Sequence, residues 1–471
     1  MRPFSMRDKL GYTLGDLGCC CTEQFRAMYL SVFYTLILQV NPFHIGILML
    51  ITKIWDAVND PIIGAIVDSR KATKGGKFIP WIRAFSFPMA VLCILGFVNV
   101  SNLAYGLRLA YMFVTYVLYE ALYTCVNVPF GTLSSVMTDD VRHRTALSRY
   151  RSLGGTIFMT VIVMVGPLVL YVDNKPVAGR FLMLASVFAL IGLLCLQITC
   201  VWCKERVAVP ERPKGEKLNY LHVIKEIAKN KALLGVMFFS LVGMIGASVV
   251  NGLNTYLFKD YFGNVKIMAV SGGLSVLYSL ITFAITQPLA DKLGKKEWCC
   301  WGAGFAAAVF ALLFFFPIHN PVLFIVINGV CYLGASGMQV LIWAMVNDSI
   351  DYHELQTGER NEGIVYSTYS FFRKLASAVS GSLSSFVLGF IGYNVAEGAV
   401  QTAEVSNAIW KSYTGIYVLG YGVAVAILFF VYPLTKAKTT EMLEQLKARR
   451  AEKASTVQAL ASQGGGIVLR N

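Results

Sequence analysis

Four oxygen-bearing side chains lie at helical spacing within an otherwise apolar stretch. They are Thr52, Asp56, Asn59 and Asp60. Their order of i, i+4, i+7 and i+8 places them on one face of a helix. Such oxygens suit an alkali cation, and two neighbouring carboxylates can instead share a proton, because both cannot stay ionised cheaply. The pattern predicts a Na⁺ or H⁺ site at Asp56 and Asp60. The alternative is a structural ion pair between Asp56 and Lys53.

A second polar row lies further along the chain. Glu120, Thr124 and Asn127 recur at i, i+4 and i+7, with Tyr123 beside them. Side chains at this spacing share one face of a helix. So regular a row within an apolar stretch indicates a face that lines a cavity.

The first apolar stretch carries a similar row with two interpretations. Asp16, Cys20 and Glu23 have the same spacing, and Arg26 follows. Glu23 can contact a solute, or Arg26 can neutralise it from three residues away. The sequence leaves both interpretations open.

The C-terminal part of the chain offers a positive charge and several amides. Ser370 and Lys374 share a helix face, while Asn251 and Gln339 lie in other apolar stretches. Amides also pin membrane helices together, so a structural role for them stays open. Aromatic side chains can stack on a sugar ring or serve as core residues. The candidates are Trp55, Tyr123, Trp343, Tyr366 and Tyr369.

The composition predicts that apolar membrane helices position these polar side chains. Of the 471 residues, 56% are hydrophobic and 14% are charged. A soluble globular domain cannot keep so much apolar surface from water, whereas a bilayer core of about 30 Å takes about 20 apolar residues per helix. The sequence predicts an all-α membrane protein with twelve transmembrane helices, over residues 10–40, 44–68, 80–101, 106–137, 151–171, 181–203, 232–260, 267–290, 297–317, 321–348, 363–392 and 412–434.

Basic residues predict the orientation, because Lys and Arg near the ends of membrane helices stay in the cytoplasm. With the N-terminus inside, roughly 33 of the 41 Lys and Arg fall on the cytoplasmic side and roughly 6 outside. We therefore expect a multi-pass protein of the inner (plasma) membrane with both termini in the cytoplasm. Cytoplasmic loops then account for the net charge of +14, and no nucleic-acid partner is expected.

The longest polar stretch between the expected spans is Lys204 to Lys231, and it separates the first six spans from the last six. An internal echo supports the division, because Asn59-Asp60-Pro61 and Gln287-Pro288-Leu289-Ala290-Asp291 each precede a basic loop. Such repeats place a solute site near the membrane midplane, between the halves. The expected parts are a six-helix half over 1–203, a cytoplasmic linker over 204–231, a second six-helix half over 232–435, and a partly disordered cytoplasmic tail over 436–471.

Several separated motifs resemble those of one transporter family. Lys53-Ile54-Trp55-Asp56-Ala57-Val58-Asn59-Asp60-Pro61 and Gly76-Lys77-Phe78-Ile79-Pro80-Trp81 are similar to the glycoside-pentoside-hexuronide:cation symporters. The resemblance continues through Asn127-Val128-Pro129-Phe130-Gly131-Thr132-Leu133, Arg144-Thr145, Asn251-Gly252 and Asp348-Ser349-Ile350-Asp351-Tyr352. It implies the major facilitator superfamily fold, alternating access, and symport of a sugar or glycoside with a cation.

The resemblance also assigns roles to single residues. It places Asp56, Asn59, Asp60 and Thr124 in the cation site, and Trp55, Tyr123, Arg151 and Lys374 near the sugar. Members that transport melibiose have sugar-binding aspartates where this chain has Cys20 and Asn127. The difference argues against a galactoside and favours solutes like those of the xyloside and glucuronide transporters. Cys20, Asn127 and Asn251 complete the expected substrate-binding set.

Other functions remain open. A carrier with the same fold can move a non-sugar solute, and a non-transporting membrane sensor is a further alternative. A sensor, however, has little reason to keep two carboxylates inside a span. An enzyme is disfavoured, because the sequence has no nucleophile–base or metal-ligand pattern. The expected partners are a small sugar or glycoside and the lipid bilayer, with no cofactor beyond the coupling ion Na⁺ or H⁺.

Overall fold

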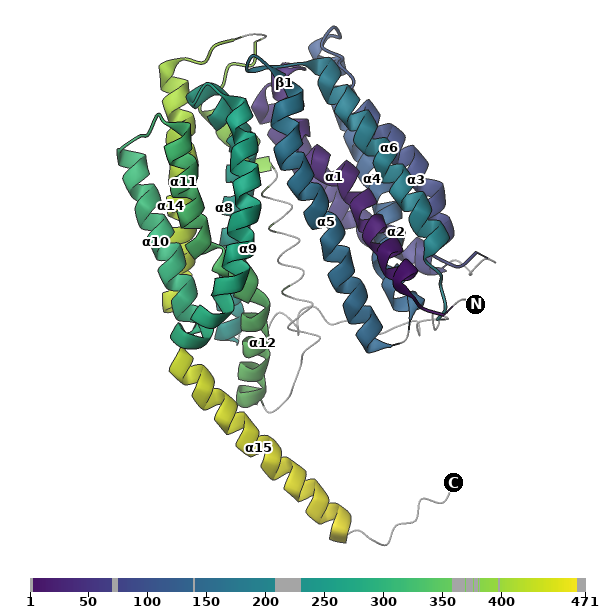
Figure 1. The fold of residues 1–471 in the computed structure, drawn as a ribbon, viewed down its shortest axis with the longest axis vertical. Helices are drawn as coiled ribbons and strands as arrows, with labels where there is room; N and C mark the ends of the chain where they lie inside the picture. Colours follow the sequence, from purple (N-terminus) through teal and green to yellow (C-terminus); the bar gives the residue numbers. More distant parts are fainter. Residues whose placement is uncertain are drawn as a thin grey trace.

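The computed structural model describes residues 3–69, 75–138, 140–207, 230–357, 369, 376, 380, 382–396 and 399–463. Two helical bundles lie side by side, and the chain completes one before it begins the other (Figure 1). They form the N-terminal and C-terminal halves. Most of the predicted linker over 204–231 and of the predicted span over 363–392 lies outside the described residues.

The N-terminal half consists of long helices and one short hairpin. The helices are α1 (Met6–Leu36), α2 (Pro42–Ser69), α3 (Ile79–Leu95), α4 (Tyr105–Met137), α5 (Val141–Leu170) and α6 (Ala178–Trp202). The antiparallel strands β1 (Tyr171–Val172) and β2 (Lys175–Pro176) join α5 to α6.

The C-terminal half begins with α8 (Lys231–Tyr256), which continues into the π-helix η1 (Leu257–Tyr261) and the 3₁₀ helix η2 (Val265–Ile267). Its other elements are α9 (Met268–Leu293), α10 (Lys295–Phe315), α11 (Pro321–Ala335), α12 (Gly337–Thr357), a helical segment over 382–390, α14 (Ala403–Phe430) and α15 (Lys436–Gln463).

Polar side chains fix the starts of several helices. Asn320 accepts hydrogen bonds from two backbone N–H groups of α11, and Pro321 follows at the first helical position. Both residue types favour a helix start. Asp140 caps α5 in the same way, by accepting from the backbone N–H of Arg142 at 2.7 Å. Local sequence therefore fixes where these helices begin.

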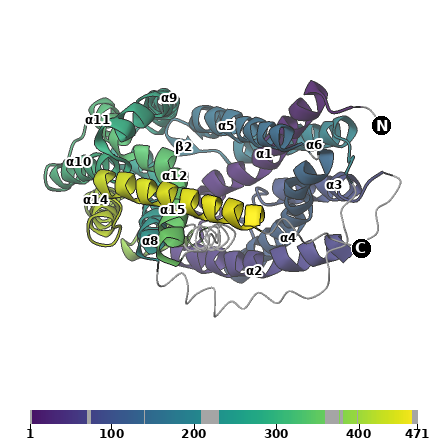
Figure 2. The ribbon, with the colours of Figure 1, turned by 90° about the horizontal axis from the view of Figure 1, so that it is seen from below.

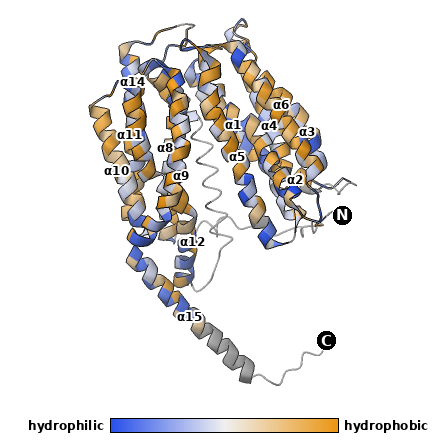
Figure 3. Ribbon diagram, viewed as in Figure 1, coloured by the Kyte–Doolittle hydropathy of each residue, from blue (hydrophilic) through white to orange (hydrophobic). Residues whose placement is uncertain are grey.

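Eight spans among the described helices are long and apolar enough to cross a membrane. Helix α3 is apolar but shorter, and α1 and α2 contain several ionisable residues. Hydrophobic residues predominate along the helices of both halves (Figure 3). The chain is thus a multi-pass membrane protein, as predicted, and the full count of twelve spans stays a prediction.

Several predicted spans had wrong boundaries, among them the span predicted over 412–434, whose helix α14 already begins at Ala403. The span predicted over 151–171 is the apolar part of α5, which begins at Val141 with a polar, basic stretch. The span predicted over 321–348 is interrupted at Ser336, between α11 and α12, and continues to Thr357. Hydropathy marks only the apolar part of a helix, so it reports neither polar ends nor a break within an apolar run.

Glycines bring α1 close to α5 and α6. A Cβ atom at Gly154 of α5 would lie 2.5 Å from the backbone oxygen of Thr13. A Cβ at Gly18 would lie 2.8 Å from the backbone oxygen of Gly192 in α6. Larger residues would force these helices apart, so glycine sets the distance between them.

The two ends of the molecule have different cores. At the end that carries β1 and β2, here the hairpin end, one buried cluster holds Phe33 and Phe181 of the N-terminal half together with Tyr256 and Trp410 of the C-terminal half. At the opposite end, here the terminal end, each half has its own buried cluster. The halves therefore share a core at the hairpin end and pack separately at the terminal end.

Two direct contacts join the halves at the hairpin end. The ring of Phe43 in α2 lies 5.2 Å from the rings of Phe386 and Phe390, measured between centroids. The hydroxyl of Ser31 in α1 lies 3.1 Å from that of Ser385. The segment over 382–390 thus seals against α1 and α2.

The hairpin turn also reaches across to the other half. Asp173 and Asn174 have φ of +46° and +61°, as the central residues of a type I′ turn require. The amide of Asn174 donates to the backbone oxygen of Lys259 at 2.8 Å and accepts from the backbone N–H of Val265 at 2.9 Å. One side chain therefore links the N-terminal half to η1 and η2.

Helix α15 lies at the terminal end. It starts beneath the C-terminal half and runs toward the N-terminal half (Figure 2). Met442 and Leu446 pack into the buried cluster of the C-terminal half, and Arg449 donates to the backbone oxygen of Leu355 at 3.1 Å. The first part of the predicted tail is thus a docked helix.

Candidate functional site

The polar rows of α2 and α4 meet. Thr124 Oγ1 lies 3.1 Å from Asp60 Oδ1 and 3.4 Å from Asp56 Oδ1. The hydroxyl has one hydrogen, so it donates to one carboxylate at a time and bridges the pair. Asn59 is buried, and its Nδ2 has no hydrogen-bond partner among the described residues. The arrangement concentrates oxygen ligands and negative charge at one point inside the membrane.

Thr52 plays no part in this cluster. Its hydroxyl donates to the backbone of its own helix, 2.9 Å from Leu48 O and 3.0 Å from Met49 O. Thr52 is also fully buried, and both of these hydrogen bonds stay within α2. Of the four residues predicted to share this helix face, Asp56, Asn59 and Asp60 remain candidates for the cation site.

A charge cluster next to this site joins three helices. Glu120 of α4 lies 3.7 Å from Arg26 of α1 and 3.8 Å from Lys53 of α2. The Arg26 guanidinium also lies 3.4 Å from the ring centroid of Tyr119, a cation–π contact. Arg26 and Lys53 thus neutralise Glu120, where the sequence suggested Glu23 and Asp56 as their partners. Among the described residues, neither of those two alternative pairs comes within the 4.0 Å of an ion pair.

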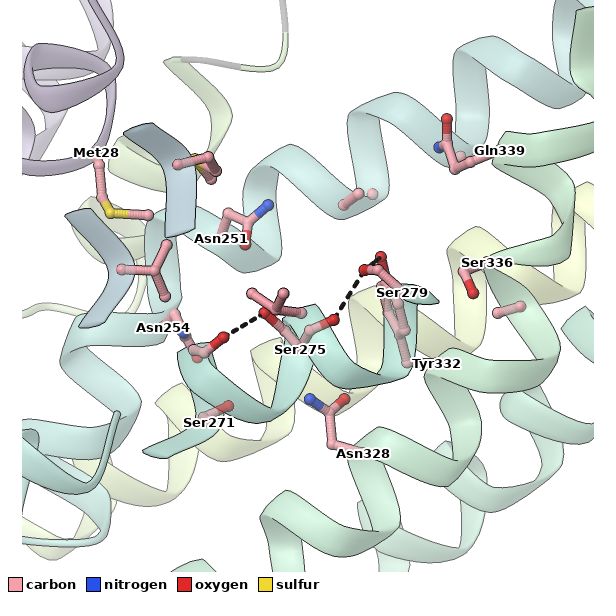
Figure 4. A pocket seen from close by; sticks show the side chains of 18 of the residues that line it. Met28, Asn251, Asn254, Ser271, Ser275, Ser279, Asn328, Tyr332, Ser336 and Gln339 are labelled. Atoms are coloured by element: carbon pink, nitrogen blue, oxygen red, sulfur yellow. Dashed lines mark hydrogen bonds between the residues drawn. The ribbon is translucent and has the colours of Figure 1, made fainter. Parts of the chain in front are cut away.

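A cavity of about 720 Å³ lies between the two halves (Figure 4). Its N-terminal wall comes from α1 and α5, and its C-terminal wall from α8, α9, α11, α12 and α14. Two predicted solute residues, Cys20 and Asn251, line it. The volume is in the range of about 300 to 1,000 Å³ that is usual for small-molecule sites.

An ion pair stands at the N-terminal wall. Arg151 Nε donates to Asp16 Oδ1 at 2.9 Å, and the Arg151 side chain stays 39% exposed. The Sγ of Cys20 lies 3.8 Å from Asp16 Oδ2, and Gln24 donates to this sulfur at 3.3 Å. Asp16 thus orients Arg151, which does not itself belong to the described cavity wall. Contact of Arg151 with a solute stays a prediction.

Other predicted solute residues lie elsewhere. Trp55 is 40% exposed on α2, Tyr123 stacks on Tyr119 with centroids 6.0 Å apart, and Asn127 is half-buried on α4. The described cavity wall includes none of Trp55, Tyr123 and Asn127. Lys374 lies outside the described residues. Contact of these four residues with a solute stays a prediction.

The sequence model of the family described as MFS/sugar transport protein matches residues 11–436. The chain belongs to this family. The family membership confirms the predicted major facilitator fold and excludes the enzyme reading, because the similar proteins are transporters.

Individual relatives of this MFS/sugar transport protein cover nearly the whole chain. An uncharacterized symporter, YjmB of Bacillus subtilis (strain 168), is 31% identical over 94% of this chain and 95% of its own. An isoprimeverose transporter of Lactiplantibacillus pentosus is 29% identical over 95% of this chain and 93% of its own. The crystal structure of the nucleoside transporter NupG matches the fold alone, with a TM-score of 0.61, 13% identity, and coverage of 89% of this chain and 98% of its own.

The cavity of this MFS/sugar transport protein also contains residues that the sequence reasoning missed. Ser271, Ser275 and Ser279 lie on its α9 wall, with Asn328 and Tyr332 on α11. The serines recur at i, i+4 and i+8, the same kind of signal that identified the carboxylates of α2. Serine carries no charge and is common in membrane helices, so the signal was weak by comparison.

Proposed function

We propose that the protein is a secondary active transporter that imports a sugar or glycoside by symport with Na⁺ or H⁺. The proposal rests on the presence of two sites in one fold, one suited to a cation and one suited to a solute. Asp56, Asp60 and Thr124 form an oxygen cluster suited to a cation, and a cavity of about 720 Å³ with polar side chains in its wall lies between the halves. The isoprimeverose transporter among the relatives supports a sugar as the solute.

The packing supports alternating access. The halves share a core at the hairpin end and pack separately at the terminal end. With both termini in the cytoplasm of an inner-membrane protein, this conformation closes the cavity toward the outside. Rocking of the halves about the cavity would open the hairpin end and close the terminal end.

A chain of contacts connects the cation cluster to the cavity wall. Lys53 precedes Asp56 on α2 and pairs with Glu120, which also pairs with Arg26 of α1. The same α1 presents Asp16 and Cys20 to the cavity. A cation bound between α2 and α4 thus changes the electrostatic field on the ion pairs that connect Glu120 to Arg26 of α1. Such coupling between sites is reciprocal and amounts to about 1 to 3 kcal/mol.

The proposal includes a solute class. Cys20 and Asn127 replace carboxylates of melibiose-transporting relatives, and a carboxylate binds sugar hydroxyls through charge-assisted hydrogen bonds. Each lost contact costs about 1.5 to 3 kcal/mol. We infer that β-xylosides, glucuronides or related glycosides are better substrates than α-galactosides. Tight, Na⁺-stimulated binding of melibiose would contradict this inference.

Transport by reconstituted vesicles tests the function. Uptake of a panel of labelled glycosides is measured with and without Na⁺ at two pH values, for the wild type and for Asp56→Cys and Asp60→Cys. We expect both variants to lose cation-driven accumulation and to keep some solute binding, because each removes a charged ligand of the cation. Variants that still concentrate the sugar would show that the carboxylates are structural. Loss of a pH effect without any Na⁺ effect would identify the ion as a proton.

A further inference from the structure

The C-terminal wall of the cavity carries a row of hydroxyl groups. Ser271, Ser275 and Ser279 line the cavity from one face of α9 (Figure 4). At a rise of about 1.5 Å per residue, the row extends for about 12 Å along the helix. The cavity therefore has an extended polar wall on the side away from Asp16 and Arg151.

The hydrogen bonds of these serines show which groups face the cavity. Ser275 Oγ donates to Gly272 O at 2.7 Å, and Ser279 Oγ donates to Ser275 O at 2.8 Å. The hydroxyl of Tyr332 lies 3.2 Å from Ser279 Oγ, and either oxygen can be the donor of this hydrogen bond. The row thus presents mainly acceptor oxygens to a solute.

Amide side chains complement this row. Asn251, Asn328 and Gln339 line the same cavity, and their side-chain amides form no hydrogen bond with any described residue. Each amide offers two N–H donors and one carbonyl acceptor. A sugar hydroxyl both donates and accepts, so it matches a wall that combines acceptor oxygens with free amide donors.

The described part of the same wall carries no charged side chain. Among the described residues, the cavity lining from the C-terminal half includes no Asp, Glu, Lys, Arg or His, whereas the N-terminal wall carries Asp16 with Arg151 nearby. A neutral sugar unit needs no counter-charge and avoids the cost of leaving a charge unpaired. The two walls therefore suit different parts of one solute.

We propose that the α9–α11 wall is a second glycosyl subsite, which binds a neutral sugar unit while the first unit lies against α1 and α5. The proposal rests on the proposed function and specifies its solute as a glycoside with two sugar units. Asn328 and Ser279 determine the specificity for the second unit. The alternative is that Ser279 and Tyr332 only pin α9 to α11, which would leave the free Asn328 amide without a role.

Two probes and two variants test the subsite. The probes are a neutral disaccharide that the wild type transports and the methyl glycoside of its first unit. The variants are Asn328→Leu and the smaller change Ser279→Ala, which provides the same contrast if Asn328→Leu lowers the yield of folded protein. Thr286→Val is the matched control, because Thr286 lies on α9, outside the described cavity wall, and its buried hydroxyl has no hydrogen-bond partner among the described residues.

Binding is measured by calorimetric titration of the purified proteins. We expect each subsite variant to weaken disaccharide binding about tenfold and methyl glycoside binding less than about twofold, since each loses contacts to the second unit only. The control should leave both affinities unchanged. Equal weakening for both probes, or no weakening for either, would overturn the subsite. A wild type that binds and transports no sugar at all would instead overturn the proposed function.

Discussion

The substitution Asn174→Gly removes the side-chain hydrogen bonds of the hairpin turn and keeps its backbone conformation. Glycine adopts the φ of +61° found at this position without strain, so the turn is retained. The contacts of the amide with Lys259 and Val265 are lost. We expect the hairpin end to open more often, because these hydrogen bonds exist only while the two halves meet there.

The structure sets the size of the effect. One hydrogen bond contributes about 0.5 to 1.5 kcal/mol net. Loss of the two bonds of Asn174 therefore favours opening by about 1 to 3 kcal/mol, which is about 5- to 150-fold in the equilibrium. The ring contacts of Phe43 with Phe386 and Phe390 are unaffected, so the effect belongs to the hairpin alone.

Ser31→Cys reports the opening, since Ser31 lies at the interface, 3.1 Å from Ser385. The proposed orientation places this end outside the cell. In right-side-out vesicles, a membrane-impermeant thiol reagent should modify the new cysteine at a rate that follows the open population, after correction for native cysteines. Asp173→Gly is the control, because Asp173 shares the turn at φ +46°. A rise below about twofold for Asn174→Gly, or an equal rise for the control, would refute the reasoning.

Three further predictions concern single side chains. Thr124→Val should weaken the cation stimulation of sugar binding by about 1.5 to 3 kcal/mol, since a hydrogen bond to a charged group is lost; Thr124→Ser should restore it in the same titration. Glu120→Gln should destabilise the protein by about 3 to 5 kcal/mol in thermal denaturation, because Arg26 loses its buried counter-charge, whereas Glu23→Gln should have less effect. The backbone N–H of Arg142 lowers the pKa of Asp140 below its usual value of 3.8, so the stabilisation of α5 by the ionised cap is fully present above that pH and is lost as the pH falls further, through the lower pKa of the folded protein; the difference in melting temperature between wild type and Asp140→Ala should therefore be constant above the usual pKa of Asp and shrink only below it.

The convergence of the carboxylates could be predicted from the sequence. A helix fixes which residues share a face, so the spacing of Asp56 and Asp60 was enough to place them together. Thr124 followed from the same rule applied to α4. The two helices meet where Thr124 Oγ1 lies 3.1 Å from Asp60 Oδ1. The spacing within each helix does not predict this contact, whereas the family resemblance placed both residues in one cation site.

Partners on other helices could not be predicted. Arg26 has Glu23 one turn away on its own helix, yet it pairs with Glu120 on α4, because tertiary packing decides which carboxylate faces the guanidinium. The break at Ser336 gave no signal in hydropathy, since the apolar run continues on both sides of it. There Ser336 Oγ donates to Thr282 Oγ1 at 2.9 Å, a contact between helices that spacing along one chain does not contain.

The core shared by the halves at the hairpin end also makes the transport cycle sensitive to temperature. Rocking must separate aromatic side chains such as Phe33 from Tyr256 in that cluster and expose them to the external water. Hydration of apolar surface raises the heat capacity, and hydrophobic association weakens on cooling. Opening of the hairpin end therefore makes a positive contribution to the heat capacity, and closing of the terminal end makes a negative one. The free energy difference between the two orientations changes with temperature according to the balance of the two.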